Sequence, residues 1–188
     1  MGERLNDIEF AQVVRSTPLI SVDLIIRDPD GKVLVGLRTN EPARGLYFVP
    51  GGIIVKNETI AAAFARILDS ELGCQVSFEK ARFVGIFEHF YTANRFGNPE
   101  FGTHYIVLAY EVLLTCRPEI VLDTQHCAIR WIDERELHDA IDVHPYTKAY
   151  FQKLKKGGGW VPQRESFGAA GGLFSPGNSK TRDADSPD

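Results

Sequence analysis

The chain has little cysteine and no long apolar run. It contains three cysteines, Cys74, Cys116 and Cys127, an odd number without CxxC spacing, so neither a disulfide framework nor a zinc site is indicated. No apolar stretch approaches the ~20 residues that cross a bilayer. The polar first residues also lack the apolar core of a secretory signal. We therefore expect a cytoplasmic protein without a membrane partner.

An excess of positive charge is missing as well. The formal net charge of the 188 residues is -4, which gives no general attraction to nucleic acid, and we expect no nucleic-acid partner. An anionic ligand would have to be held by local positive charge. Hydrophobic residues make up 44% of the chain, which is enough for the core of one domain of ordinary size.

Strand and helix patterns alternate over residues 1–156, which we assign to one domain, whereas the glycine- and proline-rich residues 157–188 are typical of a disordered tail. A turn at residues 28–31 joins the first two strands into a hairpin. Gly73 ends the first predicted helix. The predicted strands span 19–27, 32–38, 47–50, 75–78, 82–90, 102–114 and 128–132, and the helices 59–72, 134–140 and 145–155. This order predicts an α/β fold with a mixed sheet between helices.

Residues 52–74 match most of the Nudix box, G-x5-E-x7-R-E-U-x-E-E-x-G-U, a loop-helix-loop that holds a metal-bound diphosphate. The matching residues are Gly52, Glu58, Arg66, Leu68, Glu71 and Gly73. Ile67 and Ser70 replace two of the expected glutamates. The chain therefore resembles the Nudix hydrolases, and the resemblance implies their α/β/α sandwich.

The two missing glutamates change the expected chemistry. On a helix, residues 67, 70 and 71 share one face, so a complete box would direct three carboxylates at one cluster of cations. This chain keeps only Glu71. One carboxylate helps to hold a single Mg²⁺ but suits several ions poorly. The pattern points away from the multi-metal attack on phosphorus that is typical of the superfamily.

A second set of sequence strings indicates a branch of the superfamily. Over residues 4–155 the chain resembles the GDP-mannose mannosyl hydrolases, an atypical Nudix group that lacks the same two glutamates. The resemblance rests on six strings in order: Val13–Ser21, Gly36–Asn40, Phe48–Gly52, His89–Tyr91, Thr103–Tyr105, and Gln125-His126 shortly before Arg130-Trp131.

This resemblance implies a metal site and a general base. The carbonyl oxygen of Gly51 is a metal ligand in the resembled group, and with Glu71 and Gln125 it would form an oxygen site suited to one Mg²⁺ per subunit, with Mn²⁺ as a substitute. His126 is our candidate general base, because it adjoins a proposed ligand and an ordinary histidine titrates near neutral pH. By themselves, Gly51 and Gly52 indicate no more than a tight turn.

Seven residues are candidates for substrate binding. The resemblance implies that Arg38 contacts the departing diphosphate and that the N-terminal segment covers the base, partly from the partner subunit of a homodimer in which residues 1–18 are exchanged. A carboxylate within an apolar strand requires a partner, such as an arginine or donors of guanine. The candidates are Leu5, Phe10, Asp23, Arg38, Arg66, His89 and Tyr105.

Each candidate also has a structural interpretation. Phe10 is equally suited to be a core anchor, and packing explains His89 and Tyr105 equally well. Arg38 is otherwise an exposed charge at a strand end. Arg66 can orient Glu71 or reach phosphate oxygens, and its structural interpretation is a solvent-exposed helical arginine. Glu58 is interpreted as structural. The remaining histidines, His104, His138 and His144, are interpreted as ordinary surface or core residues.

The predicted function is Mg²⁺-dependent hydrolysis of GDP-mannose or a related GDP-hexose to GDP and free sugar, by attack of water on the anomeric carbon. Two alternatives remain open: conventional Nudix cleavage at phosphorus of a nucleoside diphosphate derivative, and a non-catalytic module that binds sugar nucleotides. One departure concerns the substrate. The resembled enzymes usually carry arginine immediately after the glycine pair, where this chain has Ile53.

Overall fold

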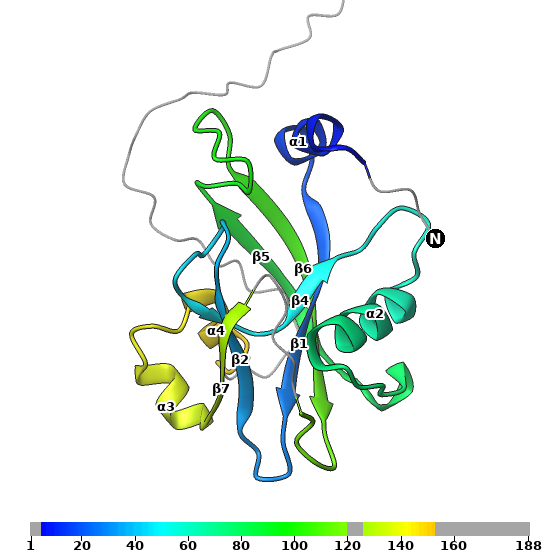
Figure 1. The fold of residues 1–188 in the computed structure, drawn as a ribbon, viewed down its shortest axis with the longest axis vertical. Coiled ribbons are helices and arrows are strands. Elements are labelled where there is room, and N and C mark those ends of the chain that lie inside the picture. The colour runs from blue at the N-terminus through cyan, green and yellow to red at the C-terminus, as the bar shows by residue number, and fades with distance from the viewer. Residues whose placement is uncertain (1–4, 120–125, 153–188) are drawn as a thin grey trace, which may run out of the picture.

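The computed structural model describes residues 5–119 and 126–152 (Figure 1). Five helices and seven strands follow one another within these ranges. In chain order they are α1 (Asp7–Ser16), β1 (Leu19–Arg27), β2 (Val33–Arg38), β3 (Tyr47–Phe48), β4 (Gly51–Ile53), α2 (Ile60–Leu72), the 3-10 helix η1 (Phe78–Lys80), β5 (Arg82–Tyr91), β6 (Thr103–Leu113), β7 (His126–Ile132), α3 (Glu134–Asp139) and α4 (Pro145–Ala149).

The strands form one mixed sheet in the order β3-β2-β1-β6-β5, with β4 paired to β1 and β7 paired to β2. The central pair, β1 and β6, is parallel over its whole length, from Leu19 opposite Tyr105 to Arg27 opposite Leu113. All other named pairs are antiparallel. Strand β1 therefore lies inside the sheet, with paired strands on both sides. The presence of parallel and antiparallel pairs agrees with the predicted mixed sheet.

Helices cover both faces of the sheet, so the predicted sandwich is confirmed (Figure 1). Side chains alternate between the faces along each strand. In β1, Val22 and Leu24 pack in the cluster that also contains Phe64 and Leu68 of α2. Ile25 packs in the opposite cluster with α3 and α4. Asp23 therefore points to the face that α4 covers.

Helix α2 has the boundaries that its sequence predicts. Thr59 is its N-cap, and the Thr59 hydroxyl accepts a hydrogen bond from the backbone N–H of Ala62 at 3.1 Å. Gly73 is its C-cap, with a φ of 61° in the left-handed region that favours glycine. These caps fix where the helix begins and ends, and so place Glu71 in its last turn.

The β1–β2 hairpin also agrees with the prediction. The backbone N–H of Gly31 donates to the carbonyl of Asp28 at 2.9 Å, and Gly31 has a φ of 81°. A positive φ at this point is why the turn needs glycine. Strands β5, β6 and β7 lie within two residues of their predicted ranges.

Two local predictions were wrong. Residues 75–78 form no strand, because Phe78 begins η1. The Phe78 ring packs against Phe64 and Tyr110, so this apolar residue serves packing beneath a turn. Helix α1 was not expected. Its start is fixed by a capping box in which the Asn6 side chain accepts from the N–H of Glu9 while the Glu9 carboxylate accepts from the N–H of Asn6.

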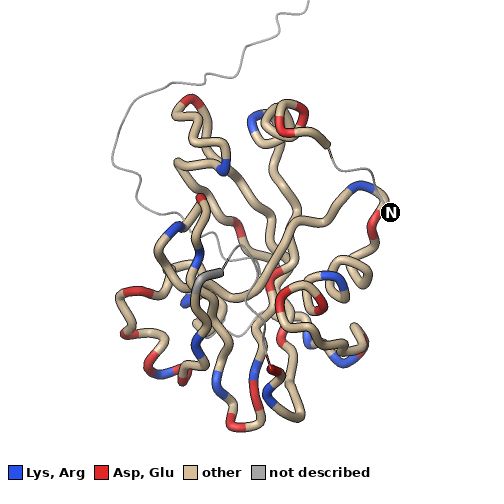
Figure 2. The backbone as a smooth tube through the Cα atoms, viewed as in Figure 1, with Lys and Arg blue, Asp and Glu red and all other residues tan. Residues whose placement is uncertain are grey.

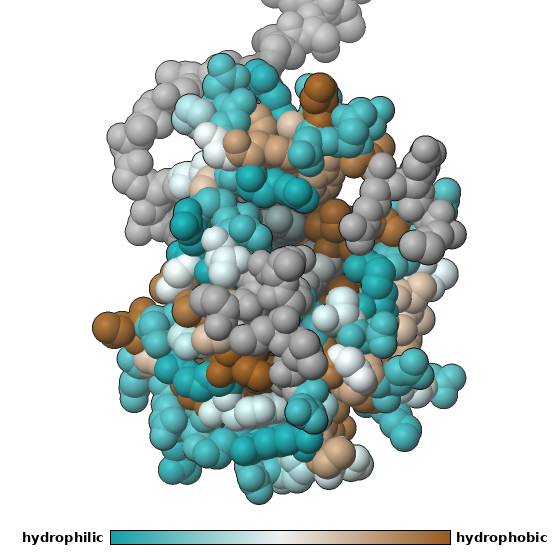
Figure 3. All heavy atoms as spheres, in the orientation of Figure 1, coloured by the Kyte–Doolittle hydropathy of each residue, from teal (hydrophilic) through white to brown (hydrophobic). Residues whose placement is uncertain are grey.

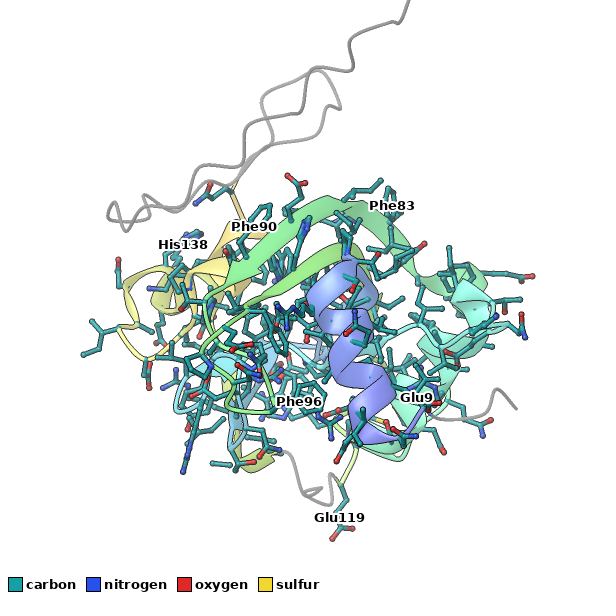
Figure 4. The ribbon with its side chains drawn as sticks, turned by 90° about the horizontal axis from the view of Figure 1, so that it is seen from above. Glu9, Phe83, Phe90, Phe96, Glu119 and His138 are labelled. Carbon is teal, nitrogen blue, oxygen red and sulfur yellow. The ribbon has the colours of Figure 1, made fainter. Side chains whose placement is uncertain are left out.

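Helix α1 lies across one end of the sheet beside the loop between β5 and β6 (Figure 4). Phe96, labelled in that view, meets Phe10 edge to face with ring centroids 5.9 Å apart. The Arg95 guanidinium lies 5.6 Å from the Phe10 ring centroid and 5.5 Å from that of Phe96. Phe10 is thus an anchor of α1 within this chain.

The described surface has mixed charge and scattered apolar groups. Acidic and basic residues are interspersed along the backbone (Figure 2). The face in Figure 3 is mostly teal with separate brown patches. The most exposed large apolar side chains are those of Ile8 in α1 and of Ile141 in the turn after α3. Among the described residues, no helix is both long and apolar enough to span a membrane.

The last predicted helix, 145–155, is observed as α4 at Pro145–Ala149. Residues 153–155 lie outside the described ranges, as do the predicted domain end at residue 156 and the tail at 157–188. These two boundaries therefore stay predictions, as does the exchange of residues 1–18 in a homodimer.

Candidate active site

A buried polar cluster lies on the face of the sheet that α4 covers. The Tyr150 hydroxyl donates to Oδ2 of Asp23 at 2.6 Å and lies 3.2 Å from Nε2 of His89. Asp23 is 6% exposed, His89 3% and Tyr150 6%. A carboxylate, a phenol and an imidazole are thus brought together from β1, from the residue after α4 and from β5.

Burial shifts the pKa values of this cluster in opposite directions. Burial raises the pKa of Asp23 to about 6, although the Tyr150 hydrogen bond and the charge of Arg38 lower it. Burial, helped by the neighbouring His144, lowers the pKa of His89 to about 3. At neutral pH the cluster therefore holds an ionised carboxylate and a neutral imidazole.

Arg38 supplies positive charge to the same region. Its charge lowers the pKa values of Asp23, Tyr91 and Tyr105, although burial, the larger effect, raises all three. Within the described residues, the buried Nε of Arg38 has no hydrogen-bond partner. An unsatisfied guanidinium nitrogen is costly, and an anionic ligand would satisfy it.

Tyr105 adjoins this cluster through the sheet. It lies opposite His89 in the β5–β6 register, and its ring meets that of Tyr91 edge to face at 6.0 Å between centroids. Four predicted substrate-binding residues, Asp23, Arg38, His89 and Tyr105, are therefore gathered in one place. Their sequence positions alone did not require this.

Strand β4 brings Gly51 against the cluster. Gly51 lies opposite Asp23 in the β1–β4 register. A Cβ at this position would lie 2.5 Å from Oδ1 of Asp23 and 3.0 Å from the carbonyl oxygen of Val22. The close approach of the two strands therefore excludes any side chain at Gly51 and leaves its backbone beside the carboxylate.

Helix α2 approaches β4 from the opposite side of the sheet. Arg66 donates from Nε to Glu58 at 2.7 Å and from Nη2 to the Ile53 carbonyl at 2.9 Å. Hydrogen bonding to Arg66 lowers the pKa of Glu58. The structural interpretation of Glu58 agrees with this geometry. The observed partners of Arg66 are Glu58 and Ile53, so its contact with phosphate stays a prediction.

The two substituted box positions differ in their surroundings. Ile67 is 1% exposed in the core beneath α2 and lies 3.3 Å from where a Cβ on Gly52 would be. Ser70 is exposed, and its hydroxyl donates to the Ile67 carbonyl at 3.1 Å. Glu71 is half-buried in the last turn of the helix. Ile67 therefore contributes to the hydrophobic core where the box would place a metal ligand.

The donor groups for a metal ion are sparse. Over residues 5–119 and 126–152 no group of three or more histidine, cysteine, aspartate or glutamate residues could hold an ion. Of the predicted ligands, Gly51 offers a backbone oxygen and Glu71 a carboxylate, whereas Gln125 lies outside the described residues. This sparse oxygen set fits one hard cation that keeps water or substrate oxygens in its remaining positions.

The predicted base lies at the end of β7. The backbone of His126 pairs with Arg38 of β2, which places it at the same strand end as the arginine of the cluster. Its role as general base stays a prediction, as does the role of Gln125. Leu5 is 52% exposed beside α1, and the predicted contact of Leu5 and Phe10 with a base is untested.

Three residues of the cluster were missed in the sequence. His144 was interpreted as ordinary, yet burial and the charge of Arg38 lower its pKa to about 4. Its Nδ1 accepts the N–H of Tyr146 at 3.1 Å, and Tyr146 stacks on His89 with centroids 4.1 Å apart. Tyr150 lies one helical turn beyond Tyr146. A cap residue before a proline, followed by tyrosines four apart, was the available signal.

Comparison with known proteins identifies the family. The NUDIX domain model matches residues 17–154, most of the chain and all of the elements described above except α1. The chain belongs to the Nudix family. Nudix hydrolases generally use a divalent metal ion and act on nucleotide-derived substrates, which agrees with the oxygen donors and the unsatisfied arginine of this site.

One curated relative of this Nudix protein is the low-salt glycan biosynthesis protein Agl8 of Haloferax volcanii. The two are 40% identical over 151 residues, which cover 80% of this chain and 91% of the relative. Solved structures with the same fold include the MutT Nudix hydrolase of Burkholderia pseudomallei, with 23% identity and a TM-score of 0.60 over 74% of this chain and 100% of that one. The MutT protein of Methanosarcina mazei Go1 has 18% identity and a TM-score of 0.60 over 73% and 94%.

The raised pKa of Asp23 predicts a pH-dependent gain in stability for Asp23→Asn. Burial favours the neutral carboxyl, so its contribution to stability is complete below about pH 4 and is lost as pH rises through about 6. Asparagine does not titrate. The free energy of unfolding should exceed that of the wild type by up to roughly 3 kcal/mol at pH 7, and the difference should vanish below pH 4. Denaturant titrations with Asp139→Asn, an exposed control, measure this. A difference that does not vary with pH would contradict it.

Restoring the two box glutamates should have unequal effects. Ile67→Glu buries a carboxylate in the core and should lower the free energy of unfolding by about 3–5 kcal/mol. Ser70→Glu places the same group at an exposed position and should change it by less than about 1 kcal/mol. Thermal and denaturant unfolding of the two variants provide the comparison. Equal stability of both would show that Ile67 is not a core residue.

Proposed function

We propose that this Nudix protein hydrolyses GDP-mannose or a related GDP-hexose to GDP and free sugar, with one Mg²⁺ per subunit and Mn²⁺ as a substitute. The observation that carries the proposal is the cluster of Asp23, His89 and Tyr105 beside the Nε of Arg38, which has no hydrogen-bond partner within residues 5–119 and 126–152. Polar groups that suit sugar hydroxyls lie next to a cation that suits a diphosphate. The name of the relative Agl8, a glycan biosynthesis protein, supports a sugar-nucleotide substrate.

The residues that would hold the metal in this proposal are Gly51 through its carbonyl, Glu71 through its carboxylate, and Gln125, which lies outside the described residues. When bound, the ion offsets negative charge on the diphosphate and so makes it a better leaving group. Position 51 requires glycine because Asp23 fills the space that a side chain would need, so no side chain of residue 51 covers its backbone. Glu71 is oriented by its place in the last turn of α2, between Leu68 and the Gly73 cap.

The reaction requires a base for water and positive charge for the leaving group. His126 would accept a proton from water that attacks the anomeric carbon, which inverts that centre. Arg38 would stabilise charge on the departing diphosphate. Arg66 supports this arrangement by fixing the loop between β4 and α2 through Glu58 and the Ile53 carbonyl. A diphosphate leaves without protonation, so the proposal needs no second carboxylic acid.

The fold and the family are shared with enzymes of other chemistry, so the products decide among the alternatives. Cleavage at phosphorus would give GMP and a sugar phosphate, and a binding module would give no turnover. We also expect a cytoplasmic homodimer in which the N-terminal segment of one subunit reaches the base bound by its partner. Size measurement by light scattering tests the oligomeric state independently of activity.

Hydrolysis in ¹⁸O-labelled water tests where water attacks. The label should enter the anomeric hydroxyl of the sugar and leave GDP unlabelled. His126→Gln should lower kcat by ~10²–10⁴ while sparing metal affinity. His138→Gln, an exposed histidine on α3 (labelled in Figure 4), is the matched control. Label in the phosphate would overturn the proposed mechanism and favour conventional Nudix cleavage.

Glu71 is the single carboxylate among the three box positions 67, 70 and 71, and this predicts the metal stoichiometry. Titration calorimetry should give one Mg²⁺ per subunit in the presence of GDP, and Glu71→Gln should abolish both metal binding and turnover. Glu79→Gln replaces an exposed carboxylate just beyond α2 and should have no effect. Two or more ions required for turnover would count against the one-metal proposal.

A further inference from the structure

Tyr150 joins the two buried groups that the proposed reaction uses for its ligand. The hydroxyl is 2.6 Å from Oδ2 of Asp23 and 3.2 Å from Nε2 of His89. The ring is held independently of that hydroxyl, because it meets Phe87 edge to face at 4.7 Å between centroids. The hydroxyl can therefore be removed with little change in packing.

A count of protons fixes the direction of both hydrogen bonds. A phenol has one hydrogen to donate, and an ionised carboxylate can only accept, so Tyr150 donates to Asp23. The second contact then requires Nε2 of His89 to donate to the phenol oxygen. The neutral His89 ring must carry its hydrogen on Nε2, which leaves Nδ1 as its acceptor.

The same hydrogen bond assigns the two oxygens of Asp23. Oδ2 is occupied by Tyr150, whereas Oδ1 lies against Gly51, 2.5 Å from the position that a Cβ would take there. One carboxylate oxygen and one imidazole nitrogen thus remain as acceptors, in the region where the Nε of Arg38 has no partner among the described residues. This pattern suits a ligand that carries hydroxyl donors next to an anionic group.

We infer that Tyr150 is a positioning residue that sets the hydrogen-bonding pattern of the buried polar cluster. Its hydroxyl fixes the orientation of the Asp23 carboxylate and the tautomer of His89, and Tyr150 touches no ligand itself. Tyr146 holds the plane of the His89 ring by stacking at an interplanar angle of 4°. Tyr146 thus fixes where the imidazole lies, and Tyr150 fixes which of its nitrogens donates.

Nitrogen NMR of the ¹⁵N-histidine-labelled protein tests the tautomer without any assumption about the substrate. His89 should show the neutral Nε2–H form at pH 7 in the wild type and lose that preference in Tyr150→Phe. Tyr110→Phe is the matched control, since Tyr110 is a buried tyrosine on the opposite face of the sheet, in the cluster with Phe64. The Nδ1–H form in the wild type, or an unchanged Nε2–H form in Tyr150→Phe, would overturn the inference.

Kinetics with GDP-mannose test whether Tyr150 affects substrate binding. This experiment rests on the proposed function. Tyr150→Phe should raise KM roughly tenfold to hundredfold with a smaller change in kcat, since it disturbs groups that bind the sugar. In a His89→Ala, Asp23→Asn background, the same change should add less than about twofold. An unchanged KM, or a full effect in that background, would contradict the positioning role.

The NMR and kinetic experiments distinguish failure of the inference on Tyr150 from failure of the proposed function. If the wild type does not hydrolyse GDP-mannose to GDP and mannose, the proposed function fails, while the His89 tautomer still decides whether Tyr150 sets the pattern. If turnover is present and the tautomer is unaffected by Tyr150→Phe, the inference fails while the function stands. Should Tyr150→Phe prove too unstable to measure, an Nδ1–H form in the wild-type spectrum would still overturn the inference.

Discussion

Burying a carboxylate at the centre of a sheet is costly unless the group is hydrogen-bonded and lies near positive charge. The Tyr150 hydroxyl and the charge of Arg38 offset part of this cost for Asp23, although burial still raises its pKa to about 6. Each of these partners depends on a different part of the fold, because Tyr150 follows α4 and Arg38 ends β2. The position of α4 on the sheet and the path of β2 are therefore tied to the chemistry of one side chain in β1.

The same carboxylate constrains β4. Because Oδ1 of Asp23 occupies the space where a side chain at Gly51 would lie, the strand must carry glycine there. On the far side of β4, a Cβ at Gly52 would lie 3.3 Å from Cγ1 of Ile67 in α2, which is a tight but less severe approach. The glycine pair thus lies between a polar cluster on one face and an apolar core on the other. In this chain Ile67 belongs to the apolar core, although the Nudix box has a metal-binding glutamate at that position.

Local signals accounted for much of the fold. The hairpin turn at Asp28–Gly31 and the ends of α2 were predicted because turn and cap residues act through the backbone next to them. The segment 75–78 was misassigned because its apolar residues follow a strand-like pattern in the sequence. In the structure they pack beneath a turn. Helix α1 was not predicted although Asn6 and Glu9 form a capping box. Val14 is its only buried residue, and Phe10 packs against Phe96 of the loop between β5 and β6, so its position depends on tertiary contacts.

The sequence by itself determined the family, the single carboxylate at box positions 67, 70 and 71, and the separate candidates Asp23, Arg38, His89 and Tyr105. Each of these depends on residue type and local spacing. Only the tertiary structure decided that these four meet on one face, that Ile67 is a core residue, and that Tyr150 lies between Asp23 and His89. Such contacts depend on strand register and on how α4 docks, since parallel pairing of β1 with β6 joins segments more than eighty residues apart. No local pattern specifies a hydrogen bond across that separation.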